Sequence, residues 1–300
     1  MVISHISNKI IIGEESSFGT EASAYDKNFG FIQSFSYTEN ESIEQIGTIG
    51  GGHTHNRNEP GIYHISGTLV TLVTKSTLPI VLTAFLGGYS DDGVDYTITS
   101  STTVKSYSVK AQHSDDDIAK ITGIVFTNLS IDASKDGTLE VSMDYIGKKL
   151  ELVTESITPI IPTDSLYSWL DIFGTYNSLN LIGNSFSIEL DWNIDPNDGR
   201  GLESVTAGER RLIQRVIKNN LNVSGNFDAL IQDTEFFGYN DEITESSFVL
   251  TLSRGTDNQH TFTLSNAVLD NKSVEKTAEA GLSNMTADVL AFDITVTGNL

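Results

Sequence analysis

The chain has 300 residues, with 18 lysines and arginines against 40 aspartates and glutamates, and a formal net charge of −22. A surface this acidic repels phosphate backbones, which disfavours ordinary DNA or RNA binding because that function needs a basic stripe. No cysteine occurs, so disulfide frameworks, thiolate metal sites and sulfur redox chemistry are excluded.

Length and hydropathy further limit the kinds of protein that the chain can be. The apolar content of 38% is enough for a packed core, and the length suits two domains of ordinary size. The N-terminus lacks a signal-peptide pattern, and no apolar stretch approaches the roughly 18 residues of a membrane span. We therefore expect a folded protein that is made in the cytosol and is not inserted into a membrane.

The first segment with a clear helical pattern is STLPIVLTAFLGG. Leu78, Val81, Leu82 and Phe85 recur at the spacing of one helix face, and Gly87 follows as a helix terminator. A second, less regular helix is predicted in SGNFDALIQDTEFFGYN, which also stops at a glycine.

Period-two alternation dominates the rest of the chain and predicts antiparallel strands with one buried face. The clearest cases are TLEVSMDY, SFSIELDWNI and LAFDITV. Their predicted buried residues are Leu139, Val141, Met143 and Tyr145 in the first, Phe186, Ile188, Leu190, Trp192 and Ile194 in the second, and Leu290, Phe292, Ile294 and Val296 in the third.

Short patterns recur in the same order in both halves, which indicates an internal duplication. Residues 34–36 match 185–187, residues 66–67 match 224–225, and residues 86–87 match 237–238. A proline-containing linker lies near residues 155–165. We interpret the chain as mainly β, with two tandem antiparallel β-sandwich or barrel-like domains over residues 1–155 and 156–300, each with one short flanking α-helix.

No catalytic or cofactor motif emerges. His53, His55 and His64 could supply imidazole ligands, but their loop lacks an acidic partner at a fixed spacing. GTIGGGHT lacks the lysine and hydroxyl of a phosphate-binding loop, and no serine lies in a nucleophile-elbow sequence. We therefore expect a protein that is not an enzyme and that binds no cofactor or metal.

Two long polar loops, GTIGGGHTHNRNEPG and DPNDGRGLESVTAGER, follow matching strands in the two halves. Long loops without structure of their own are uncommon unless they are functional, so we expect contacts between copies there. The basic cluster GERRLIQRVIK either forms a solvated face or binds carboxylates of a neighbouring subunit. The candidate interface residues are Gly50, His53, His55, Arg57, Asp198, Arg200, Arg210, Arg211 and Arg215.

The opening IIGEESSFGTEAS, with its Phe18, Gly19 and Thr20 step, resembles the start of tail-tube proteins of long-tailed, siphovirus-like phages of the duplicated two-domain type. The stretch from FSIELDWNI to NFDALIQDTEFF is similar to the same family in its order of strand, long loop, strand and helix. The resemblance spans most of the chain, although its motifs are loose patterns.

The resemblance implies that three copies form a ring of six domains, and that rings stack into a hollow tube in the virion tail. The implied partners are other copies of the chain, tail proteins such as the tape measure and the terminator, and viral DNA that passes without sequence-specific binding. A conduit should repel DNA, so we expect an acidic lumen on polar strand faces. The candidate lumen residues are Glu140, Ser142, Asp144, Asp288 and Asp293.

Two alternatives stay open on the sequence alone. One is another virion part, such as a tail terminator, a sheath component or a fibre module. The other is a carbohydrate-binding or glycan-cleaving β-sandwich. Such proteins usually bind sugars with exposed aromatic side chains, and two tryptophans, Trp169 and Trp192, are few for that purpose. Consecutive acids such as those at 115–117 could form a glycosidase pair, but they are more typical of solvated turns.

Overall fold

The computed structural model describes residues 9–46, 57–112, 117–177, 179–196, 212–231, 246–254, 259–276 and 283–299. Within these ranges the chain is mainly β, with one α-helix and a short 3-10 turn at Trp169–Asp171. The elements are β1 (Ile10–Glu14), β2 (Phe31–Ile46), β3 (Arg57–Leu72), α1 (Leu78–Leu86), β4 (Gly87–Asp91), β5 (Asp95–Ser100), β6 (Tyr107–Gln112), β7 (Asp117–Ser134), β8 (Glu140–Gly147), β9 (Lys149–Thr154), β10 (Ile172–Tyr176), β11 (Leu179–Asp191), β12 (Asn222–Ile231), β13 (Ser246–Ser253), β14 (Gln259–Lys276), β15 (Ser283–Ala291) and β16 (Asp293–Asn299).

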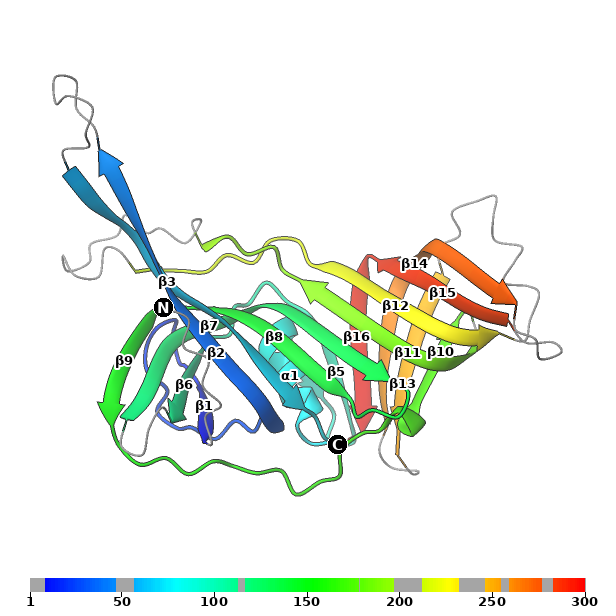
Figure 1. Cartoon of the computed structure of the whole chain (residues 1–300). Coiled ribbons are helices and arrows are strands. Elements are labelled where there is room, and N and C mark those ends of the chain that lie inside the picture. Colours follow the sequence, from blue (N-terminus) through cyan, green and yellow to red (C-terminus); the bar gives the residue numbers. More distant parts are fainter. Residues whose placement is uncertain are drawn as a thin grey trace.

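Eight antiparallel strands form one long sheet that runs through both halves of the chain (Figure 1). Its order is β2, β3, β8, β7, β11, β12, β15 and β14. The halves meet where β7 pairs with β11, from Ser134 opposite Ser185 to Asn128 opposite Asp191. The first four strands and the last four therefore follow each other without a break in hydrogen bonding.

Two shorter sheets complete a sandwich-like arrangement. In the first half β1, β6, β7 and β9 pair in that order, and in the second half β10, β13, β14 and β16 do the same. The long strands β7 and β14 each belong to the long sheet with one end and to a short sheet with the other. In the second half the start of β11 also pairs with β10. Each half therefore folds a core between two sheets that share strands, β7 in the first half and β11 and β14 in the second.

Some irregularities of register fall at corresponding places in the two halves. The pairing of β2 with β3 shifts between Ile32 and Ser34, and that of β11 with β12 shifts between Gly183 and Ser185. Likewise, β6 with β7 shifts after Tyr107, and β13 with β14 shifts after Ser246. A bulge bends its strand and increases the local twist. Three further shifts, after Glu41, Phe126 and Asp270, have no counterpart in the other half, so the halves share only part of their curvature.

The helix predicted at residues 78–86 is confirmed as α1. Leu78, Val81, Leu82 and Phe85 are buried, and Gly87 ends the helix at φ 91° with its backbone N–H donating to the Thr83 carbonyl. Glycine adopts this positive φ without the steric penalty that a Cβ imposes, which explains the abrupt end. The alternation at 139–145 and 186–192 is also confirmed, because the predicted apolar residues there are buried. Ile194, predicted on the same face, is only partly buried and lies beyond the end of β11 at Asp191.

The second predicted helix is wrong for the residues that the structure describes. Residues 222–231 form β12, in which Phe227 and Ala229 are buried at alternating positions between β11 and β15. Pairing on both sides outweighs a weak helical spacing, because it gives the backbone groups of the strand hydrogen-bonding neighbours on both edges. The remainder of the prediction, residues 232–238, lies outside the described ranges.

The prediction of one strand over LAFDITV is also wrong. The chain bends at Phe292, so that β15 ends at Ala291 and β16 begins at Asp293 in a different sheet. Ile294 and Val296 are buried as predicted, whereas Leu290 and Phe292 are 51% and 71% exposed. Two exposed apolar side chains therefore lie at this corner.

The C-terminus of α1 is capped by the other half of the chain. The Phe85 carbonyl accepts hydrogen bonds from the Trp192 indole at 3.1 Å and from the Lys218 ammonium at 2.9 Å. The same ammonium lies 4.3 Å from the centroid of a Trp192 ring. A cation at this end of a helix interacts favourably with the helix dipole and with the last free carbonyls, so Lys218 fastens the halves together. Burial nevertheless lowers the pKa of Lys218 to about 8.

We predict that Lys218→Met changes how stability depends on pH. The folded pKa is lower than that of a free lysine, so between about pH 8 and 10.5 the unfolded chain holds more protons than the folded chain. The unfolding free energy of the native protein should therefore rise through this window relative to the variant, by about 3 kcal/mol at most. Chemical denaturation at several pH values measures the difference. Lys135→Met controls for the loss of one charge, and a constant difference across the window would contradict the prediction.

Candidate functional site

The side of the long sheet that points away from the core is polar across both halves. Buried residues such as Leu129, Met143, Ile188 and Phe227 alternate with polar ones along each strand. We call this surface the polar face. Its residues include Asn128, Ser130, Asp132, Glu140, Ser142, Asp144, Ser185, Ser187, Glu189, Asp191, Ser224, Asn226, Asp228, Asp270 and Asp288, which stand opposite one another in the strand register.

Three of the four acids predicted to face a lumen lie on the polar face. Glu140 and Asp144 are exposed on β8, and Asp288 is partly exposed on β15. Asp293 does not join them, because it begins β16 in the second short sheet, where its carboxylate accepts a hydrogen bond from the Ser100 hydroxyl at 3.1 Å. The predicted group is therefore divided between two sheets.

The polar face also holds carboxylates that the sequence interpretation missed. Asp132, Glu189, Asp191, Asp228 and Asp270 all lie on it. The signal that could have found them is the same period-two alternation, in segments such as TNLSIDAS and GNFDALI, where polar residues recur at every second position. The second of these segments was interpreted as a helix, which hid its alternation.

Neutral donors surround several of these carboxylates. The Thr68 hydroxyl donates to Asp144 at 2.6 Å, and the Asn128 amide donates to Glu189 at 3.2 Å. Asp288 accepts from the Asn271 amide at 2.8 Å and from the Asn226 amide at 3.1 Å. These hydrogen bonds, chiefly that from Asn271, lower the pKa of Asp288, so its negative charge is retained at neutral pH.

Some carboxylates even stand directly opposite each other. Asp132 is paired with Glu140 across β7 and β8, and Asp270 with Asp288 across β14 and β15. Like charges at such positions are destabilising. The fold therefore carries an electrostatic cost along the polar face.

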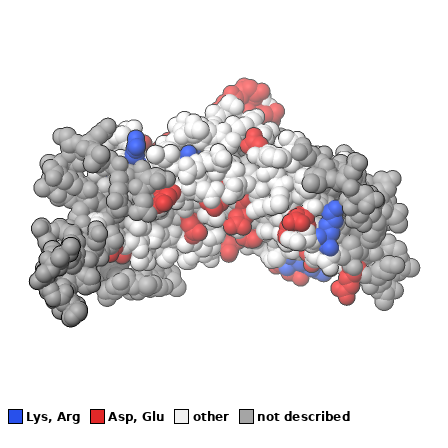
Figure 2. Space-filling model, turned by 90° about the horizontal axis from the view of Figure 1, so that it is seen from above, with Lys and Arg blue, Asp and Glu red and all other residues white. Residues whose placement is uncertain are grey.

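Cations are concentrated elsewhere in the first half. Lys110, Lys120 and Lys149 lie on the first short sheet and form ion pairs with Glu21, Glu151 and Glu155 at 2.5 to 3.2 Å. Lys120, with help from Lys149, lowers the pKa of Glu151 to about 2. Seen from above, the molecule likewise shows carboxylates over the middle of the described surface and few lysines or arginines (Figure 2).

Most predicted interface residues fall outside the described ranges. These are Gly50, His53, His55, Asp198, Arg200, Arg210 and Arg211. Arg57 begins β3, so residues 57–61 belong to a strand and not to a loop as predicted, and Arg215 is exposed. Lys218, from the same basic cluster, instead contacts the first half of its own chain.

A buried histidine in the second half is enclosed by tyrosines. His260 is buried beside Tyr96 and Tyr167, its Nδ1 is bonded to the Tyr96 hydroxyl, and burial lowers its pKa to about 4. The histidine is therefore neutral under ordinary conditions. No cluster of three metal-ligating side chains occurs among the described residues, and no described helix is long and apolar enough to cross a membrane.

Comparison with known proteins gives one family. The model of the family described as phage tail tube protein matches residues 7–299. A search of curated proteins finds no relative that matches the chain.

We predict that Glu140→Lys stabilises the isolated protein. The change turns the like-charged pair with Asp132 into an oppositely charged one, which should raise the unfolding free energy by about 0.5 to 1 kcal/mol. Glu189→Lys is the matched control, because Glu189 stands opposite two neutral residues, Ser130 and Ser224. The control change also removes the hydrogen bond that Asn128 donates to Glu189. Urea denaturation compares them, and equal effects of the two changes would show that no repulsion is stored between Asp132 and Glu140.

Proposed function

The chain belongs to the phage tail tube protein family, and we propose that three copies of it close into a ring and that rings stack into a tube that conducts viral DNA. Family membership makes it a structural component of the virion tail that assembles with itself and with other tail proteins. We further propose the tape measure and terminator proteins as partners, synthesis in the host cytoplasm, and no catalytic role.

The pairing of β7 with β11 supports ring formation, because it offers a template for the contact between copies. Within the described part of the long sheet, β7 and β11 each pair with a strand on both edges. In contrast, β2 pairs there only with β3, and residues 268–276 of β14 pair only with β15, so each leaves one edge open. Open edges of this kind invite pairing with another chain. A second copy placed with its β2 against β14 would continue the sheet in the same order.

Such a contact is head to tail, and head-to-tail contacts close into a ring when the rotation between neighbours permits it. The recurring strand order and the matching bulges support two duplicated domains, 1–155 and 156–300. If each contact repeats the curvature of the β7 to β11 pairing, three copies give six domains around one axis.

We propose that the polar face lines the lumen of this ring. In the first half the lysines of the short sheet are matched by glutamates, whereas the polar face has acids opposite acids. Duplex DNA carries about one negative charge per 1.7 Å of axis and would be gripped by a basic wall. With a Debye length of about 8 Å at physiological salt, an acidic wall repels DNA only at short range and allows it to slide.

We predict that the purified protein forms rings with threefold symmetry, or tubes built from them, because the open edges of β2 and β14 can satisfy each other. Electron microscopy at increasing protein concentration tests this. Single rings that never stack would favour a tail terminator, and solid fibres without a lumen would favour a fibre module. Either result would contradict the tube.

We predict that Asp144→Lys together with Asp288→Lys slows DNA ejection while tubes still assemble, because both positions are on the polar face and not on the open strand edges. Ejection kinetics of phage carrying the double variant measure the effect. Asp136→Lys, in the exposed turn after β7, is the control. Unchanged ejection from tubes that contain the double variant would rule out the polar face as the lumen wall.

A further inference from the structure

Three separate parts of the chain meet at one buried histidine. His260 of β14 lies opposite Gly298 of β16 in the strand register, and Gly298 lies opposite Tyr96 of β5. Glycine leaves room between them, because a Cβ at Gly298 would lie 2.5 Å from the His260 Nδ1 and 2.6 Å from the Tyr96 hydroxyl. These two groups therefore reach each other across β16 and form a hydrogen bond. Since β5 belongs to the first half of the chain, this bond joins the two halves.

The segment that connects the halves supplies the third side of the cluster. The Tyr167 ring meets the His260 ring at a steep angle of 80°, with the ring centroids 5.6 Å apart. Next to it, Leu166 forms an isolated bridge with Thr74 of the first half. Tyr96, Tyr167 and His260 are at most 1% exposed, so all three parts of the chain share one closed cluster.

The cluster suits a neutral histidine and not a charged one. The His260 Nε2 and the Tyr167 hydroxyl are buried without a hydrogen-bond partner among the described residues. A second proton on the imidazole would add a charge and a donor that these neighbours do not accept. Burial and, less strongly, the positive charge of Lys75 lower the pKa of His260 to about 4. Beside Tyr167, Asp171 already lies 4.0 Å from Arg254.

Water lies close to the other face of the cluster. Tyr96 helps to line a hollow of about 690 Å³, together with three carboxylates, Glu14, Asp26 and Asp164. None of these carboxylates is among the groups that affect the pKa of His260. The Tyr96 ring therefore separates the hollow from the imidazole, and its displacement would admit water to His260.

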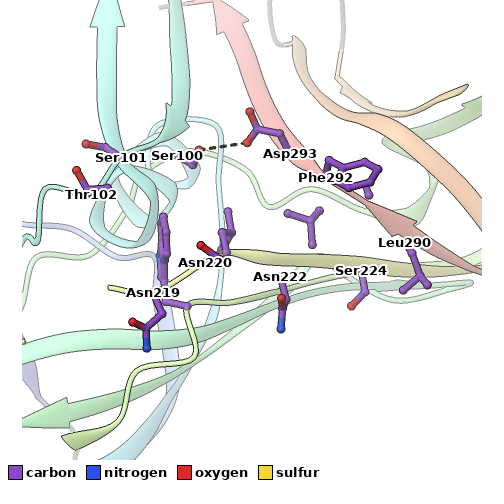
Figure 3. Close-up of a pocket in the computed structure, with 14 residues that line it drawn as sticks. Ser100, Ser101, Thr102, Asn219, Asn220, Asn222, Ser224, Leu290, Phe292 and Asp293 are labelled. Atoms are coloured by element: carbon purple, nitrogen blue, oxygen red, sulfur yellow. Dashed lines mark hydrogen bonds between the residues drawn. The ribbon is translucent and has the colours of Figure 1, made fainter. Parts of the chain in front are cut away.

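The strand that carries Tyr96 lies near the edge of its sheet. At the other end of the β5 to β16 pair, Ser100 donates to the exposed Asp293 at 3.1 Å, as the dashed line in Figure 3 shows. β4, the outer partner of β5, pairs with no other strand in the described residues. In contrast, β14 pairs at His260 with β13 on one side and β16 on the other. The β4 to β5 hairpin can therefore move with less loss of pairing than β14 can.

We propose that protonation of His260 opens the junction between the halves in acid. Tyr96 with the β4 to β5 hairpin, and Tyr167 with its segment, then move away from the imidazole while the strand pairs within each half persist. In the opened form the imidazole reaches water and binds its proton more readily than in the closed form. Opening therefore becomes easier as the pH falls from about 6.5 to about 4 and is unaffected above this range. The inference concerns the single chain and does not depend on the proposed ring.

Hydrogen exchange of the native chain and of one double variant tests the proposal. Tyr96→Phe with His260→Phe replaces both partners of the buried hydrogen bond by apolar rings, which a fold tolerates better than the loss of one partner. From pH 7 to pH 4.5 the opening equilibrium constant of segments 87–100 and 163–169 should rise about 50-fold in the native chain, after correction for intrinsic exchange rates. The double variant should show no such rise.

Two controls isolate the histidine. His64→Phe removes another histidine whose pKa is lowered by burial, but one that lies on β3. Ser100→Ala removes the hydrogen bond at the exposed end of the β5 to β16 pair. Both single variants should keep the rise of about 50-fold that is expected of the native chain.

A rise that persists in the double variant, or that appears equally in β7, β8 and β12, would overturn the proposal. If the double variant does not fold, an NMR titration of His260 in the native chain decides. An imidazole that stays neutral at pH 5.5 and gains its proton together with the loss of protection at 87–100 would support the proposal. An imidazole that titrates near its ordinary pKa while both segments stay protected would overturn it.

Discussion

The backbone pairing between β7 and β11 is the constraint on which the rest of the structure depends. Seven successive register pairs, from Ser185 with Ser134 to Asp191 with Asn128, fix how the halves are aligned. Because side chains alternate with a period of two, a slip by one residue would send every carboxylate of β11 into the core. The pairing therefore sets the continuity of the polar face, and it also brings Trp192 and Lys218 to the last turn of α1.

On the polar face, the acidic surface that the proposed function requires reduces the stability of the fold. The cross-strand pairs Asp132 with Glu140 and Asp270 with Asp288 cost stability, and a lysine at either position would relieve that cost. Neutral donors such as Asn226, Asn271 and Thr68 hold the carboxylates in place without cancelling their charge. A surface selected only for folding would use cations here, as the first short sheet does.

How much the sequence could predict depended on whether local pattern or long-range pairing decided the outcome. The alternation of β8 and β11 is strict, so these strands and their buried faces could be predicted. Residues 222–231 carry apolar residues at both helical and alternating spacings, and only the presence of β11 and β15 on either side selects a strand. The bend at Phe292 follows from the change of sheet between β15 and β16, which no local pattern records. The period-two alternation was enough to predict the polar face. It could not predict that Glu140 and Asp293 lie in two different sheets.

The two halves also differ in a way that bears on symmetry. Between β3 and β6 the first half carries α1, β4 and β5, and β5 pairs with β16 of the second half. Two strand pairs, β7 with β11 and β5 with β16, therefore hold the halves of one chain together. The hairpin of β4 and β5 extends the second short sheet, although it comes from the first half of the chain. Among the described residues only the first half carries such an extension, so the two halves of a subunit are not equivalent in the proposed ring.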